Sequence, residues 1–270
     1  MDGLLGIGSK RLLVAACIVL CLVVTIGTYG NAEESGGEPI PLLRYGTTAR
    51  IWGMGNAGVA CAQGVEGLYY NPAVFGGLRQ PELSISHSSA FVDYDLNFLA
   101  AALPVTDKAG VGVGLLISSS TGIPRTGHEE GSQKGYFDFL QTAIYVGAGL
   151  EISEGCEAGV TMKGLFGQVD DEACRGYSLE GGVRYKVNEL LTIGVLARDM
   201  VGTLSWTTGT REQIPHQIIG GATISLLDES LLITGQTDMG FKDWGFGAEY
   251  SIGDHIKLSG GYVEDRVTAG

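Results

Sequence analysis

The chain from Pro81 onward is built of short segments in which apolar residues alternate with small or polar residues. The segment Tyr136–Glu154 shows this pattern most clearly. One of its faces would carry Leu140, Thr142, Ile144, Val146, Ala148, Leu150 and Ile152, and the other Gln141, Ala143, Tyr145, Gly147, Gly149 and Glu151. Since successive side chains of a strand point to opposite faces, this two-residue period predicts a strand with one apolar face.

The same period recurs along the chain and predicts a series of strands. Their expected ranges are 82–88, 95–105, 110–119, 137–152, 156–168, 176–187, 190–200, 216–227, 231–238, 244–252 and 255–264, with a further strand beginning near Val267. Tight connections such as Thr106–Lys108 alternate with longer ones at Ser120–Gly135, Val169–Arg175 and Val201–Pro215. Outer-membrane barrels have short periplasmic turns and longer extracellular loops, whereas Greek-key sandwiches have no reason to alternate them.

These features predict an all-β fold, an up-and-down antiparallel transmembrane β-barrel of about 12–14 strands. Its apolar side chains would face lipid, and its small and polar side chains would face the lumen. Single-chain bacterial barrels close with an even number of strands, and a strand from Val267 to Gly270 is too short to pair usefully. We therefore expect the barrel to be truncated at its C-terminus. The alternative is a soluble sandwich with the apolar faces buried between two sheets.

The composition supports a membrane protein over a soluble one. Glycine accounts for 44 of the 270 residues and charged residues for only 17%, which is less charge than soluble proteins usually carry. The formal net charge of −13 argues against a nucleic-acid partner, because phosphate binding needs clustered Lys and Arg.

The N-terminal part does not follow the strand pattern. Lys10 and Arg11 precede an apolar run of about 15 residues, which is shorter than the ~20 that a membrane-spanning helix needs. Small residues at Gly30-Asn31-Ala32 then offer a cleavage site, so we expect residues 1–32 to be a signal peptide and 33–43 a polar linker. Residues 44–80, rich in Gly and Ala, would form a plug within a barrel of residues 81–270 in the bacterial outer membrane.

Three cysteines follow the expected signal peptide, at Cys61, Cys156 and Cys174. On the strand map, Cys156 opens a strand and Cys174 lies beyond its far end. That separation is several times longer than a disulfide allows, so we predict that this pair is unbridged.

A glycine-rich motif lies in the expected plug. Gly53-Met54-Gly55-Asn56-Ala57-Gly58 matches a dinucleotide-binding pattern, but no apolar strand precedes it and no βαβ unit surrounds it. Together with Ala49-Arg50, Ala60 and Tyr70-Asn71-Pro72-Ala73, it resembles the N-terminal motif of the PorV/PorQ-like outer-membrane proteins, relatives of the FadL fatty-acid channels. The resemblance covers about Gly46 to Leu78.

In that family the matching stretch is associated with the barrel lumen. The resemblance therefore implies a plug motif formed by Arg50, Gly53, Met54, Gly55, Asn71, Pro72 and Ala73. Residue chemistry agrees, because glycines let backbone pack closely against a wall and Asn71-Pro72 favours a turn.

Eight charged residues fall on the predicted inward faces, since charges facing lipid are costly. They are Glu151, Lys163, Glu180, Arg184, Lys186, Arg198, Glu249 and Lys257. Two roles remain open for them: pairing with the plug or with one another, or solvating a water-filled lumen.

The predicted function is passage of hydrophobic or small molecules across the outer membrane, with the plug as gate. The PorV-like motif implies a rival, a component of a type IX-like protein secretion apparatus that handles secreted proteins. A third possibility is a soluble exported β-protein that binds an apolar ligand. The four histidines are scattered, and although Ser88 and Ser89 follow His87, the sequence positions no orienting acid or amide beside them. The acidic clusters lack the spacing of a dedicated calcium loop. We therefore expect no enzyme, no cofactor and no metal, with outer-membrane lipid as the main partner.

Overall fold

The computed structural model describes residues 40–89, 94–126, 133–253, 255–263 and 266–269. The expected signal peptide and most of the expected linker lie outside these ranges. Four short helices come first: η1 (Pro41–Arg44), α2 (Ala49–Gly53), η2 (Gly64–Leu68) and η3 (Pro72–Gly77). The strands are β1 (Glu82–Ser89), β2 (Tyr94–Thr106), β3 (Ala109–Thr126), β4 (Gln133–Ser153), β5 (Cys156–Val169), β6 (Glu172–Lys186), β7 (Leu191–Trp206), β8 (Arg211–Gln213), β9 (Gln217–Leu226), β10 (Leu231–Asp238), β11 (Trp244–Ile252), β12 (Ile256–Val263) and β13 (Arg266–Ala269).

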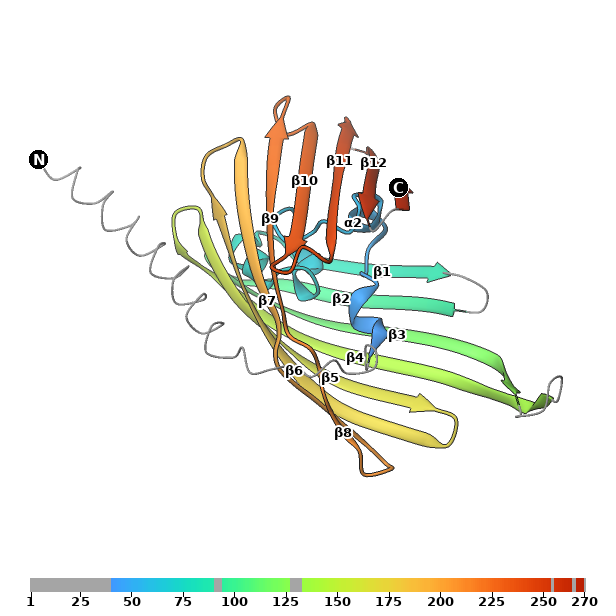
Figure 1. Cartoon of the computed structure of the whole chain (residues 1–270). Coiled ribbons are helices and arrows are strands. Elements are labelled where there is room, and N and C mark those ends of the chain that lie inside the picture. Colours follow the sequence, from blue (N-terminus) through green and yellow to red (C-terminus); the bar gives the residue numbers. More distant parts are fainter. Residues whose placement is uncertain (1–39, 90–93, 127–132, 254, 264–265, 270) are drawn as a thin grey trace, which may run out of the picture.

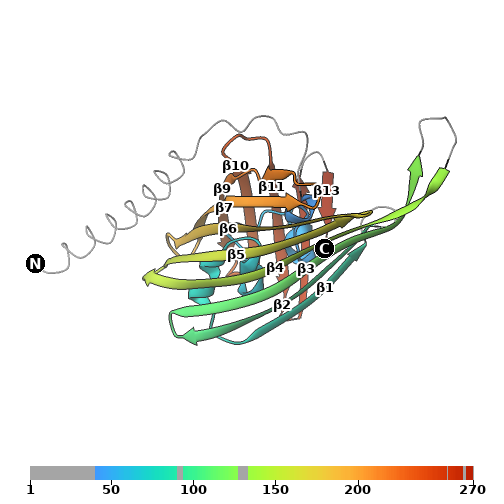
Figure 2. The same cartoon turned by 90° about the horizontal axis from the view of Figure 1, so that it is seen from below.

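All 13 strands belong to one antiparallel sheet in which each strand pairs with the next along the chain. The exception is β8, which pairs only with β7, so that β7 and β9 are neighbours. The sheet order begins with β1 and ends with β13. In Figures 1 and 2 the sheet curls strongly, and the N-terminal helices, in blue and teal, lie within its curve. The predicted up-and-down all-β architecture and the strand number are confirmed.

The two faces of the sheet differ as the alternation predicts. In β4, the side chains of Ile144, Val146 and Leu150 are 45%, 53% and 51% exposed, whereas the inward Ala143 and Tyr145 are fully buried. Because the described strands form one sheet with no second sheet stacked on its apolar face, the sandwich alternative is wrong. Among the described residues, no helix has the length and apolar character needed to cross a bilayer.

The hydrophobic core lies between the N-terminal helices and the inward face of the sheet. Leu42, Leu68 and Phe75 of this segment cluster with Leu116 of β3 and Tyr145 of β4, and all five are buried. Residues 40–81 therefore take the place that a second sheet would occupy in a sandwich. We call them the N-terminal segment.

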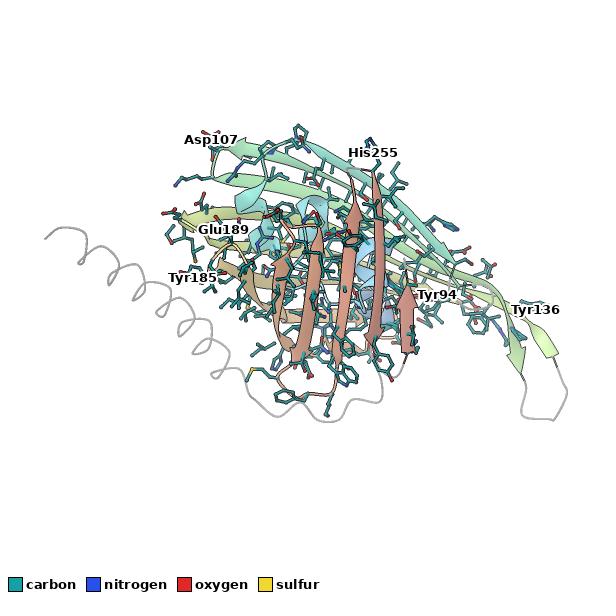
Figure 3. All side chains as sticks on the ribbon, turned by 90° about the horizontal axis from the view of Figure 1, so that it is seen from above. Tyr94, Asp107, Tyr136, Tyr185, Glu189 and His255 are labelled. Carbon is teal, nitrogen blue, oxygen red and sulfur yellow. The ribbon has the colours of Figure 1, made fainter. Side chains whose placement is uncertain are left out.

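The tight connections are found where they were predicted, but the long ones are mostly strand. β5 and β6 extend into the expected loop Val169–Arg175. Val169 at the end of β5 pairs with Glu172 at the start of β6, so only two residues make the turn. Asp170 accommodates that turn with a positive φ of 56°. β7 likewise runs to Trp206 and pairs with β8. The polar composition of these stretches resembles that of loops, although their backbones continue the ladder. Figure 3 labels Asp107 and Glu189 at the tight-turn end of the sheet and Tyr136 at the opposite end.

Aromatic side chains gather on the outer face near that opposite end. Trp244, Phe246 and Tyr262 are stacked, with ring centroids 5.5–5.8 Å apart. Trp and Tyr at one level of the outer face are typical of the aromatic girdles of membrane barrels.

Candidate functional site

The N-terminal segment touches the wall of the sheet where the wall carries glycine. A Cβ atom at Gly149 or Gly159 would lie 2.4 or 2.3 Å from the carbonyl oxygen of Pro72. At the other side of the sheet, a Cβ at Gly247 would lie 2.5 Å from the Cα of Met54. Side-chain carbons do not approach other atoms so closely, so only glycine permits backbone-to-wall contact at these positions.

The Asn71-Pro72-Ala73 triplet connects the segment to β6. Asn71 precedes η3, and its Oδ1 accepts a hydrogen bond from the backbone N–H of Ala73 at 3.1 Å. Its Nδ2 donates to the carbonyl oxygens of Val59 at 2.8 Å and of Val183 at 3.3 Å. A single buried amide thus caps a helix, links two parts of the segment and fastens both to the wall, while Pro72 occupies the first helical position that suits its fixed φ.

The Gly53-Met54-Gly55 triplet lies against the last strands. Gly55 has a φ of +65° and donates its backbone N–H to Oγ1 of Thr268 in β13 at 3.1 Å. The Thr268 hydroxyl in turn donates to the carbonyl oxygen of Gly53 at 3.0 Å. The two halves of the plug motif therefore contact two separate regions of the wall, β4–β6 and β11–β13.

Arg50 joins the segment to β11 through charge. Its guanidinium lies 2.8 Å from Glu66 in the segment and 2.8 Å from Glu249 in β11. Lys257 of β12 approaches the second oxygen of Glu249 at 3.2 Å. Burial raises the pKa of Glu66, while the neighbouring Arg50 opposes that rise. Because three of these four side chains are largely buried, we expect removal of one partner to cost more than it would at a surface ion pair.

A second group of charges is buried in the middle strands. Lys163 of β5 lies 2.7 Å from Glu180 of β6 and 3.0 Å from Asp199 of β7, and all three side chains are at most 2% exposed. Arg44 of the segment reaches the other oxygen of Asp199 at 3.2 Å, and the Ser178 hydroxyl donates to the same carboxylate. We call these ionic residues, together with Arg198, the buried charge cluster.

Asp199 was missed by the sequence analysis because simple alternation places it on the outer face. β7 contains a β-bulge opposite Glu180, and Asp199 adopts a positive φ of 52° there. Arg198 follows the inward alternation, and the bulge turns Asp199 inward beside it, so that the two residues are 8% and 1% exposed. Two adjacent charges in an apolar strand were the available signal, since regular pairing would leave one of them facing lipid.

The remaining predicted inward charges lie toward the tight-turn end. Arg184 pairs with Glu157 at 2.6 Å and donates to the carbonyl oxygen of Ala62 at 2.9 Å. Glu151 and Lys186 line a cavity beside them. Of the eight predicted charges, Arg184 and Glu249 therefore contact the segment directly, and Arg198 packs on the ring of Tyr69 in the segment, with its Cζ 5.2 Å from the ring centroid.

Two cavities flank the segment. The turn-side cavity, of about 440 Å³, is lined by Cys61 and Gln63 of the segment and by charged wall residues near the tight turns. The loop-side cavity, of about 270 Å³, is lined by Gly55 and Asn56 of the segment and by wall residues at the opposite ends of β9–β12. The segment thus separates two polar cavities.

The three cysteines of the described part of the chain lie apart from one another. Cys61, Cys156 and Cys174 are buried and form no disulfide, as predicted for Cys156 and Cys174. Burial raises the pKa of the Cys61 thiol to about 11, and its Sγ donates to the carbonyl oxygen of Ala57 at 3.1 Å. No group of three His, Cys, Asp or Glu residues in the described ranges is arranged to hold a metal ion.

These features define a curved antiparallel sheet of the outer-membrane barrel class, with an N-terminal segment inside. A search of solved structures finds a similar fold in the deltaS2S3 mutant of the monoaromatic hydrocarbon channel TodX. TodX is an outer-membrane barrel of FadL type. The TM-score is 0.61 and the identity 12%, over 83% of this chain and 84% of that chain. No family model and no curated protein matches the sequence. The predicted resemblance to FadL channels is therefore supported at the level of fold, and the resemblance to PorV/PorQ-like proteins stays a prediction.

Proposed function

We infer that this protein is an outer-membrane channel of FadL type for small molecules, in which the N-terminal segment is the gate. The observation that carries this proposal is the position of the segment between two cavities that open toward opposite ends of the sheet. The fold shared with a hydrocarbon channel supports the membrane location and the transport class. The exposed apolar outer face supplies the surface that lipid would cover.

The two parts of the segment are held in different ways, which indicates the part that moves. Residues 64–78 bury Leu68 and Phe75 in the hydrophobic core. Residues 49–62 bury Ile51, Met54 and Val59 as well, and they add polar contacts to the wall, such as the Val59 N–H to Oε1 of Gln236 at 3.0 Å and the Thr234 hydroxyl to the Ala57 carbonyl at 3.0 Å. Residues of the 49–62 part border both cavities, Gly55 and Asn56 on the loop side and Ala60 and Cys61 on the turn side, whereas no residue of 64–78 lines either cavity. Their polar contacts can exchange for water at little net cost when the cavities join. We therefore assign the gate to residues 49–62 and the anchor to residues 64–78.

Arg50→Gln tests this assignment, because it removes the charge that ties the gate to Glu249. We expect faster entry of a small sugar into liposomes containing the variant. Cys61, which lies in the gate, should also be alkylated faster, measured with Cys156 and Cys174 replaced by serine. In the closed gate, a thiol pKa of about 11 leaves only about one thiolate in a thousand at pH 8, so the wild-type reaction should be slow.

Lys257→Gln is the matched control. Lys257 of β12 lies 3.2 Å from the same carboxylate of Glu249 in β11, so this ion pair joins two wall strands and does not involve the segment. Its flux and alkylation rate should remain those of the parent protein. If Arg50→Gln leaves both readouts unchanged while the protein keeps its folded, heat-modifiable mobility on gels, the gate assignment is wrong.

A further inference from the structure

Two exposed arginines lie close together on the outer face of the sheet, at the end opposite the tight turns. Arg175 of β6 pairs with Ser205 of β7, and Ser205 pairs on its other side with Arg211 of β8. Residues that face each other across neighbouring strands point to the same side of a sheet. That side is the outer one, because Cys174 and Leu204, which precede Arg175 and Ser205 in their strands, are buried on the inner side. The Cα atoms of the two arginines are therefore about 10 Å apart, and both side chains can reach over Ser205.

Neither arginine has a counter-charge within the described part of the chain. No ion pair joins either guanidinium to a described carboxylate. Glu212, beside Arg211 in the sequence, points to the inner side and accepts a hydrogen bond from Nε1 of Trp206 at 2.8 Å. Glu172, three residues before Arg175, accepts from a threonine hydroxyl. Two uncompensated cations that can reach the same point are stabilised by an anion placed between them.

The two arginines lie just beyond the apolar part of the outer face. In β6, Tyr177 and Leu179 follow Arg175 on the same face, and Phe166 of β5 lies directly opposite Arg175. At about 3.3 Å per residue, Arg175 lies about 7 Å beyond Tyr177 and about 13 Å beyond Leu179. Aromatic residues mark the boundary between hydrocarbon and headgroups in membrane barrels. The cations are therefore at the depth of lipid headgroups, where the apolar face of the sheet ends.

We propose that Arg175, Ser205 and Arg211 form a docking site for the phosphate of an anionic membrane lipid. A guanidinium can donate two parallel N–H groups to phosphate oxygens, and the Ser205 hydroxyl adds a donor between the two arginines. The acyl chains would lie on the exposed apolar row that includes Leu179 and Val201, which face each other across β6 and β7. A free phosphate ion would leave this row unused, so the structure favours the lipid over the ion. The docking site lies on the outer wall and is separate from the proposed gate.

Native mass spectrometry of the full chain folded in detergent tests this proposal by resolving the bound lipids. The probes are phosphatidic acid, which has an anionic headgroup, and phosphatidylcholine with the same acyl chains, whose headgroup has no net charge. We expect phosphatidic acid to bind at least about tenfold more tightly than phosphatidylcholine. Arg175→Gln and Arg211→Gln should each weaken the binding of phosphatidic acid by about fivefold, and the double variant by about 25-fold, while phosphatidylcholine binding stays unchanged.

Arg125→Gln is the matched control. Arg125 is an exposed arginine at the same end of the sheet, but it already pairs with Asp170. Its removal should leave the lipid preference of the parent protein unchanged. All the substituted side chains are exposed, so the variants should keep the folded, heat-modifiable mobility on gels. If the double variant does not fold, either single variant provides the same test.

Three results would each overturn the proposal. The first is equal binding of the two lipids by the parent protein, and the second is a preference for phosphatidic acid that survives in the folded arginine variants or is lost equally in Arg125→Gln. The third is displacement of phosphatidic acid by an equal concentration of inorganic phosphate, because the site would then take the free ion.

Discussion

Gly159→Val is expected to open the channel, because the new side chain would occupy the place of the Pro72 carbonyl and displace the adjacent Asn71, whose Nδ2 holds the Val59 carbonyl of the gate at 2.8 Å. Even a single Cβ at position 159 would lie 2.3 Å from that oxygen, and the neighbouring Gly149 leaves no room for η3 to shift sideways. Overpacking of this kind costs about 1–3 kcal/mol, which would shift the ratio of open to closed channels by roughly 5- to 150-fold. Solute entry into liposomes should rise accordingly.

Gly164→Val provides the matched control on the same strand. Gly164 points to the outer face of β5, and a Cβ there would meet only the ring of Phe166 at 3.7 Å, an ordinary van der Waals distance. Both variants add the same β-branched residue to β5, so they share any effect on strand formation. Unchanged flux in Gly159→Val, with folding intact, would show that the anchor does not hold the gate closed.

Asp199→Asn is expected to cause the largest loss of stability. The substitution keeps the shape of the side chain and its tolerance for a positive φ, but removes the charge that balances Lys163 and Arg44. Removing one partner of a buried ion pair costs about 3–5 kcal/mol, because the other charge is left uncompensated. Urea unfolding of the protein in lipid vesicles would measure the difference.

An exposed ion pair offers the comparison. Arg125 pairs with Asp170 at the far ends of the long strands, where the two side chains are 45% and 39% exposed. Arg125→Ala should change the free energy of unfolding by no more than about 1 kcal/mol, since water screens this pair. If Asp199→Asn were as mild as Arg125→Ala, the buried charge cluster would not contribute to stability as described.

The strands could be predicted from sequence because one physical rule controls them. Where one face is apolar and the other is small or polar, a shift of one residue would reverse every side chain, so the alternation fixes the strand and its orientation. β10 and β11 have the predicted boundaries, Leu231–Asp238 and Trp244–Ile252. The ends of β5 and β6 near Val169 and Glu172 were not predicted, because these stretches carry polar residues on both faces and lack the alternation that marks a strand.

The interior contacts depend on backbone features that alternation does not encode. The bulge that turns Asp199 inward, and the partners Glu66 and Glu157 of Arg50 and Arg184, became evident only from the folded chain. Glycine spacing did contain information, because Gly149, Gly159 and Gly247 lie on inward faces. Sequence alone gives no means of matching each of these glycines to Pro72 or Met54.

The central claim is that the apolar face of the sheet contacts lipid and the opposite face surrounds the segment. Spin labels placed along β4 in a cysteine-free protein, reconstituted in lipid vesicles, test it most directly through collision rates with oxygen and with a water-soluble nickel complex. At positions 144, 146 and 150, oxygen collisions should dominate, whereas labels at 143 and 145 should be poorly accessible to both reagents. Dominant nickel collisions at 144, 146 and 150 would place that face in water and contradict the account.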